Sequence, residues 1–174
     1  MLIDISELRQ ERGAAATFTF REEMSHLDFG GEEIPFAAPV EVTGQAVNTG
    51  YAFLVKGTVH TALSSVCSLC LTSFELPLQA EFAALYREAD AVPEEDAEEE
   101  FFDVYPLSGD IIDLTRVVLE SIVLAVPMKP ICREDCRGLC PRCGQNRNTG
   151  SCDCSEEKGD PRFAVLQQLL HKEN

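Results

Sequence analysis

Eight cysteines are the residues of this 174-residue chain whose types and spacing point most directly to chemistry. Six of them fall within 23 residues, and the other two form a Cys-x-x-Cys pair further upstream. They are Cys67, Cys70, Cys132, Cys136, Cys140, Cys143, Cys152 and Cys154. Thiolates at short spacing hold Zn²⁺ in a tetrahedral shell with Zn–S distances of about 2.3 Å. Since eight thiolates fill two such shells, the sequence predicts two bound zinc ions.

Disulfides are the alternative reading of a cysteine-rich segment. They are typical of small exported domains, whereas the sequence that begins Met1-Leu-Ile-Asp lacks a basic stretch followed by an apolar one. We therefore favour zinc, or another thiolate-bound metal such as iron, and expect a cytoplasmic protein. No apolar run approaches the roughly eighteen residues that a membrane span needs, so no membrane partner is expected.

The spacing favours one division of the cysteines into two groups. Cys140-Pro-Arg-Cys143-Gly144 has the pattern of a zinc knuckle, and Cys152 and Cys154 can complete its shell because turn residues lie between. The other four would then staple a β domain to the segment after a helix; they are Cys67, Cys70, Cys132 and Cys136.

Two other arrangements remain open. Cys132 and Cys136 could close on the Cys140/Cys143 knuckle instead. Cys67 and Cys70 would then be free to act as a redox pair, which makes a thiol- or zinc-dependent regulatory protein the alternative function.

A filled thiolate shell indicates a structural metal, because catalytic zinc keeps one position open for water. The histidines are His26, His60 and His171, and none has ligand spacing to the cysteines. The chain has no Gly-rich phosphate loop, no Gly-x-Ser-x-Gly and no His-Glu-x-x-His. We therefore expect no enzymatic activity, no catalytic residue and no small-molecule substrate.

The net charge of −16 is unevenly distributed. Residues 1–128 carry 6 basic and 23 acidic side chains, whereas residues 129–174 carry 8 and 7. Such an acidic body repels polyanions and suits a basic protein partner. The basic residues of the tail could contact phosphate or simply neutralise thiolate sites, so direct RNA contact is left open; they are Lys129, Arg133, Arg137, Arg142 and Arg147.

Apolar residues alternate with polar ones over much of residues 39–83, and residues 16–20 repeat the pattern. This period predicts antiparallel strands, with Cys67-Ser-Leu-Cys70 at a hairpin tip where both sulfurs can face one metal. The sequence thus indicates an α+β protein whose antiparallel β domain could be barrel-like.

The period changes to that of a helix from Asp110, with Asp110 as its expected cap and Pro127 beyond its end. We expect an apolar helix over residues 110–126 that packs on the sheet, and an amphipathic C-terminal helix over residues 161–171. Eight acidic residues between 90 and 103 predict a solvated loop. Residues 1–128 then form an acidic β-rich domain, and residues 129–174 form a cysteine-rich zinc module.

The chain resembles the bacterial large ribosomal RNA subunit accumulation family, or YceD-like family, over residues 64–170. The matching segments are residues 66–71, residues 109–130, the cysteine framework from Cys132 to Cys154, and Asp160-Pro-Arg-Phe-Ala-Val-Leu166. The resemblance implies a cytosolic, non-enzymatic factor needed for 23S rRNA to accumulate, often encoded beside a large-subunit ribosomal protein. Its expected partner is a ribosomal protein or a precursor of the large subunit.

Many members of the family keep fewer cysteines in the tail than this chain does. The resemblance therefore implies that the site of Cys140, Cys143, Cys152 and Cys154 is dispensable in the family, while the other site is more central.

Overall fold

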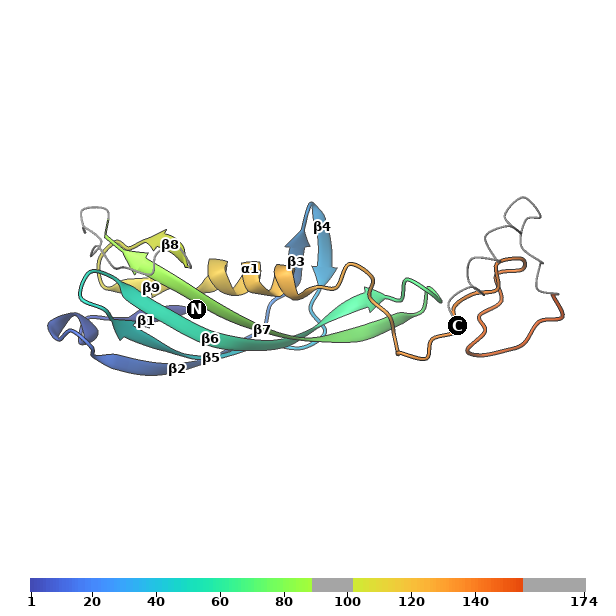
Figure 1. Ribbon diagram of the computed structural model, residues 1–174, viewed down its shortest axis with the longest axis horizontal. Helices are drawn as coiled ribbons and strands as arrows, with labels where there is room; N and C mark the ends of the chain where they lie inside the picture. Colours follow the sequence, from blue (N-terminus) through green and yellow to red (C-terminus); the bar gives the residue numbers. More distant parts are fainter. Residues whose placement is uncertain (89–101, 155–174) are drawn as a thin grey trace, which may run out of the picture.

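The computed structural model describes residues 1–88 and 102–154. These residues are mostly β-strand, with one α-helix, α1 (Thr115–Ala125), and a short 3-10 helix, η1 (Leu8–Gln10). The molecule is elongated, with a long sheet beneath α1 and the cysteine-rich segment at one end (Figure 1).

A five-stranded sheet forms the body of the molecule. Its strands, in spatial order, are β2 (Ala15–Glu22), β5 (Val40–Asn48), β6 (Phe53–Val66), β7 (Ser73–Arg87) and β8 (Asp103–Pro106). Neighbours are antiparallel except for β7 and β8, which are parallel. The sheet is open, with β2 and β8 at its edges, so the barrel-like form is wrong. Five strands leave β2 and β8 unpaired with each other, and closing a sheet into a barrel depends on the number and stagger of its strands.

Two smaller antiparallel pairs flank this sheet. They are β1 (Leu2–Asp4) with β9 (Ile111–Asp113), and the hairpin of β3 (His26–Phe29) and β4 (Glu32–Pro35). The β1–β9 pair corrects the start of the predicted helix, since residues 111–113 pair with the N-terminal strand. Asp110 therefore does not cap α1; Asp113 Oδ1 instead accepts the Thr115 backbone N–H at 2.9 Å.

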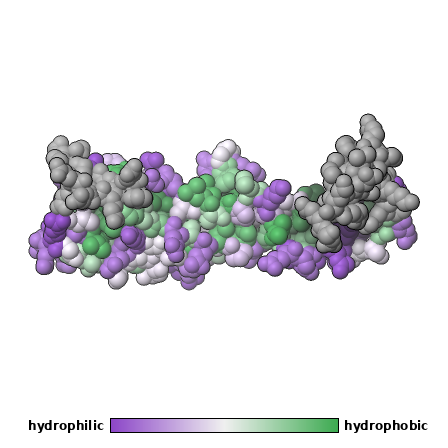
Figure 2. Space-filling model, viewed as in Figure 1, coloured by the Kyte–Doolittle hydropathy of each residue, from purple (hydrophilic) through white to green (hydrophobic). Residues whose placement is uncertain are grey.

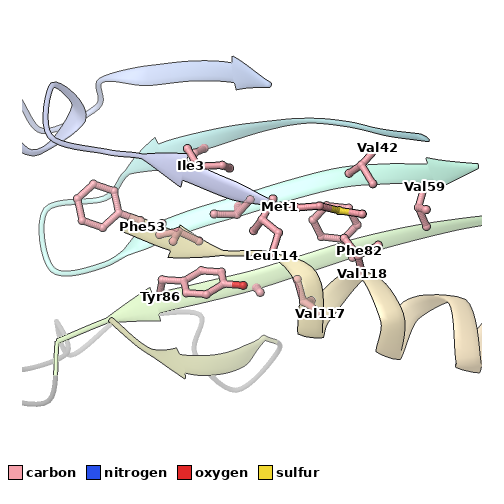
Figure 3. Packing of buried hydrophobic residues seen from close by; sticks show 14 of the residues in the cluster. Met1, Ile3, Val42, Phe53, Val59, Phe82, Tyr86, Leu114, Val117 and Val118 are labelled. Carbon is pink, nitrogen blue, oxygen red and sulfur yellow. The ribbon is translucent and has the colours of Figure 1, made fainter. Parts of the chain in front are cut away.

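The core lies between the sheet and the layer formed by α1, β1 and β9 (Figure 3). Val117, Val118 and Ile122 make up the buried face of α1, which packs on β7 as the apolar period predicts. Burying an aliphatic side chain contributes about 1.5–3 kcal/mol, so this face holds α1 in place on the sheet.

The β6–β7 hairpin is longer than the strands beside it. β5 pairs with β6 only as far as Glu41 opposite His60, whereas β6 and β7 remain paired up to Val66 opposite Ser73. Near the middle of this extension the segment after β4 adds a bridge between Phe36 and Leu63. The extension carries its tip to the end of the molecule where the cysteine-rich segment lies (Figure 1).

The predicted helix over residues 161–171 lies wholly outside the described residues. The predicted acidic loop over residues 90–103 also lies outside them, except for residues 102 and 103. Within the part of the chain that is described, no helix is long and apolar enough to cross a membrane.

Candidate metal centre

The tip of the β6–β7 hairpin is a tight knuckle. The Cys67 N–H donates to the Thr72 carbonyl at 3.0 Å, and the Leu71 N–H donates to the Cys67 carbonyl at 2.9 Å. Cys67 and Cys70 therefore lie in one turn, as the sequence predicts, and both are buried, with 0% and 4% of their surfaces exposed.

A second knuckle repeats this hydrogen-bond pattern. The Cys140 N–H donates to the Gln145 carbonyl at 2.8 Å, and the Gly144 N–H donates to the Cys140 carbonyl at 2.9 Å. In both knuckles the residue after the second cysteine has a left-handed backbone, with φ of 58° at Leu71 and 73° at Gly144.

Leu71 is the less favourable occupant of that position. A left-handed backbone costs a residue with a Cβ roughly 1–2 kcal/mol, a penalty that glycine avoids. The knuckle at Leu71 is therefore held by its surroundings rather than by its own backbone preference.

The structure brings Cys67, Cys70, Cys132 and Cys136 together; we call these four the first cysteine group. Their sulfur atoms all lie within 4.8 Å of one another. The Cys67 and Cys136 sulfurs are 3.8 Å apart, and the Cys70 and Cys132 sulfurs are 3.7 Å apart.

Backbone hydrogen bonds hold the segment that follows α1 against the Cys67–Cys70 knuckle. The Ser68 N–H donates to the Pro130 carbonyl at 2.8 Å, two residues before Cys132. The Leu139 N–H donates to the Leu69 carbonyl at 3.0 Å, so the chain is fastened again after Cys136. The packing of α1 and these two bonds place Cys132 and Cys136 beside the hairpin tip.

The second cysteine group consists of Cys140, Cys143, Cys152 and Cys154, whose sulfurs also lie within 4.8 Å of one another. Cys140 is buried, Cys143 is exposed, and the other two are half-buried. This division into two groups of four is the one favoured on spacing, and Cys132 and Cys136 do not close on the Cys140/Cys143 knuckle.

The sulfur positions fit a tetrahedral metal better than disulfides. A tetrahedron with Zn–S bonds of about 2.3 Å has sulfur–sulfur edges of about 3.8 Å, close to the two separations in the first cysteine group. A disulfide requires about 2.05 Å, and all eight cysteines are free thiols in the structure. Both groups could therefore hold metal ions.

The thiols of each group have divergent proton affinities. Burial raises the pKa of the Cys67 thiol, but the backbone N–H groups of Cys132, Cys70 and Leu69 outweigh it and lower that pKa to about 6. Burial and the neighbouring Cys67 and Cys70 raise the pKa of Cys132 to about 12. A group of this kind opposes full deprotonation unless a cation is present.

The second cysteine group shows the same divergence. The N–H groups of Cys143 and Arg142 lower the pKa of Cys140 to about 6. A hydrogen bond that the Cys154 thiol donates to Cys143, together with burial, raises the pKa of Cys154 to about 12.

Asn148, from the loop of the second cysteine group, supports the first. Its Nδ2 lies 3.4 Å from the Cys136 sulfur and also donates to Asn146 Oδ1 at 3.0 Å. Its Oδ1 accepts from the Arg133 guanidinium at 2.8 Å and from the Arg137 N–H at 2.9 Å. The backbone donor fixes the orientation of the amide, so an N–H group must point at the sulfur.

Asn146 reaches the first cysteine group on its other side. Its Nδ2 donates at 3.2 Å to Thr72 Oγ1, which lies 3.4 Å from the Cys70 sulfur. Sequence reasoning treated Asn146 and Asn148 as turn residues and missed these contacts. The only signal was the presence of two asparagines between the cysteines of one predicted site.

We expect Cys67→Ser and Cys152→Ser to differ in their effects. Cys67 joins the hairpin to a segment about sixty residues away, and metal binding contributes roughly 10–16 kcal/mol in model zinc peptides. Cys67→Ser should therefore unfold or aggregate the protein, whereas Cys152→Ser should keep the cooperative unfolding of the sheet. Thermal unfolding followed by far-UV circular dichroism measures this, and equal melting temperatures would contradict it.

Asn148→Asp should accelerate metal loss from the first cysteine group, because a carboxylate cannot donate to the Cys136 sulfur and repels it. Removing such a support typically weakens metal binding about 10–100-fold. Release to a chromogenic chelator measures the rate. Gln145→Glu, which adds the same charge at an exposed position of the same loop, is the control. Equal release rates in the two variants would show that the Asn148 contact is unimportant.

The family comparison agrees with the cysteine framework. The family model described as "Large ribosomal RNA subunit accumulation protein YceD" matches residues 55–170, a span that contains all eight cysteines. No solved structure matches the chain.

Several bacterial and plant proteins are similar to this chain. An uncharacterized protein of Mycobacterium tuberculosis is 32% identical over 121 residues, covering 70% of this chain and 57% of the relative. The uncharacterized protein YlbN of Bacillus subtilis is 26% identical over 173 residues, covering 98% and 96%. The chloroplastic large ribosomal RNA subunit accumulation protein YCED homolog 1 of Arabidopsis thaliana is 24% identical over 163 residues, covering 79% and 50%.

This chain thus spans 57% to 62% of the length of the mycobacterial relatives that it matches. Because the family model covers well over half of the chain, including both cysteine groups, the protein belongs to the YceD family of large ribosomal RNA subunit accumulation proteins.

Proposed function

We propose that this protein is a zinc-stabilised, non-enzymatic cytoplasmic factor that supports 23S rRNA accumulation and large-subunit biogenesis. The observation that carries the proposal is the presence of two complete four-thiol groups in a member of a family named for large-subunit rRNA accumulation.

The assignment of zinc rests on the type and number of the ligands. Four thiols with sulfur separations of 3.7 and 3.8 Å suit a tetrahedral ion, and four-cysteine shells are typical of structural zinc. The metal would join the sheet to the cysteine-rich segment and provide folding energy rather than chemistry.

The proposed partner is a basic ribosomal protein or a precursor particle of the large subunit. The net charge of −16 favours basic protein surfaces over bare RNA. Arg133, one of the basic residues near the cysteine groups, already contacts Asp135 at 3.3 Å and Asn148 at 2.8 Å. These contacts favour a role in organising the metal site over a role in binding phosphate.

The contacts of His26 and His60, the two histidines within the residues that the structure describes, support a non-enzymatic role. His26 Nδ1 lies 2.9 Å from Ser25 Oγ, and its Nε2 lies 3.5 Å from Glu33, on the exposed β3–β4 hairpin. His60 is exposed on β6. Neither histidine is among the ligands of the two cysteine groups.

The redox alternative requires an oxidant to reach Cys67 and Cys70. Both are buried, at 0% and 4% exposure, whereas Cys143 of the second cysteine group is exposed. Thiol oxidation follows exposure as well as thiolate character, so Cys143 would react first. The burial of the Cys67/Cys70 pair therefore favours the structural role.

Protein purified without added metal should contain two zinc ions per chain, because each group of four thiols fills one tetrahedral shell. Inductively coupled plasma mass spectrometry measures the metal content. One zinc or fewer, or iron with a visible charge-transfer band, would refute the two-zinc proposal. Loss of zinc with formation of a Cys67–Cys70 disulfide under mild peroxide would favour the redox alternative.

A strain that lacks this protein should accumulate less 23S rRNA relative to 16S rRNA, and the intact gene should restore the balance. Quantitative RNA electrophoresis measures the ratio. The purified protein should leave precursor and mature 23S rRNA uncleaved. A normal ratio in the deletion strain would remove the biogenesis proposal, and cleavage of RNA would remove the non-enzymatic one.

A further inference from the structure

A groove lies along the outer side of α1, away from the cysteine groups. It encloses about 750 Å³ and is lined by residues of α1, β3, β8 and β9. In Figure 1, β8 and the β3–β4 hairpin stand on either side of α1. In the same view, Figure 2 shows hydrophobic residues gathered over the middle of the molecule, where α1 and this hairpin lie. We call this feature the α1 groove.

The α1 groove has an apolar lining. Leu27 of β3 is buried there, and Leu119 and Val123 of α1 are half-buried beside it. Leu124 also lines the groove and is 86% exposed, and Met128, four residues further on, is fully exposed. Large apolar side chains that are exposed beside a groove mark an interaction site more often than isolated ones do.

Carboxylates surround this apolar lining. Four acidic residues line the groove, namely Asp28, Asp103, Asp113 and Glu120. The one cation among the residues that line it, Arg116, contacts Glu120 at 2.8 Å and lies over the Tyr105 ring at 5.5 Å. The guanidinium is therefore neutralised within α1, and the remaining carboxylates give the groove a negative field.

We propose that the α1 groove binds a segment of a basic large-subunit ribosomal protein, with an apolar side chain against Leu124 and Lys or Arg side chains toward the carboxylates. This inference rests on the proposed function, and it identifies the surface through which the protein binds its partner. Binding an apolar anchor inside a charged rim is the usual arrangement of a protein interface.

The charge of the groove selects this occupant over others. RNA is negatively charged, so the carboxylates of the groove would repel it. A second copy of this chain, itself at −16, would bring like charge to the groove. Residues 155–174 of this chain carry 4 acidic and 3 basic side chains, which gives them no excess of positive charge to offer.

The test uses full-length protein with a photoreactive p-benzoylphenylalanine in place of Leu124, mixed with the ribosomal proteins and rRNA of dissociated large subunits from the same organism. We expect a crosslink to a ribosomal protein segment that contains Lys or Arg beside an apolar residue. The same photoreactive residue at Leu2, which is 60% exposed on β1, should not form this crosslink. Crosslinks to residues 155–174, to a second copy or to RNA would overturn the proposal.

The crosslinked ribosomal protein is then titrated against single variants. Leu124→Asn and Asp103→Asn should each weaken binding about tenfold, as changes near the centre of an interface commonly do. Leu2→Asn and Glu81→Gln, on exposed positions of β1 and β7, are the matched controls and should change it less than twofold. The Asp103→Asn effect should shrink as salt rises, since charge interactions are screened beyond about 8 Å at physiological ionic strength. Unchanged binding in both groove variants would overturn the proposal.

Complementation separates this inference from the proposed function. In a deletion strain with reduced 23S rRNA, Leu124→Asn should restore the RNA less well than Leu2→Asn at equal protein levels. Full restoration by Leu124→Asn would overturn the groove proposal and leave the proposed function standing. A deletion strain with normal 23S rRNA would overturn the proposed function, whereas the crosslink itself reports on the groove alone.

Discussion

The mutual repulsion of closely packed thiolates is the constraint on which the arrangement of this molecule depends. Four sulfurs within 4.8 Å of one another cannot all be ionised without a cation among them. Burial first, and then the neighbouring thiols, raise the pKa of Cys132 to about 12, and hydrogen bonding with Cys143, together with burial, raises the pKa of Cys154 to about 12. Backbone N–H groups stabilise one thiolate in each knuckle, at Cys67 and Cys140. A divalent metal would remove this repulsion and make each cysteine group a rigid junction.

The sheet and the helix make the first of these junctions possible. The extended β6–β7 hairpin presents two thiols at its tip, and α1, fixed on β7 by its apolar face, sets the starting point of the chain that brings the other two. The bond from Ser68 to Pro130 guides that chain over its last step. Much of the entropy lost on closing the long loop between Cys70 and Cys132 is therefore offset by packing of the core, and a metal bound there would fix a geometry that is already close.

The features that the sequence predicted correctly depend on neighbours along the chain. Period-two alternation located β2, β5, β6 and β7, and Cys-x-x-Cys spacing located both knuckles. The features that it missed depend on contacts between distant residues. Residues 111–113 continue a helical period, yet they pair with β1, more than a hundred residues upstream. Asn148 fits a turn equally well whether or not its amide reaches Cys136, and nothing in the local sequence requires Leu71 to adopt a left-handed backbone.

The two cysteine groups are not independent modules. The chain between Cys143 and Cys152 can present Asn146 and Asn148 to the first cysteine group only if its own ends are held, and those ends are ligands of the second group. Metal at the second group would therefore order the donors that face Cys136 and Thr72. Since coupling between two binding equilibria is reciprocal, metal at the first group must favour metal at the second by the same free energy. The loop between Cys143 and Cys152 would thus strengthen the junction between the sheet and the segment after α1, although it contributes no ligand to it.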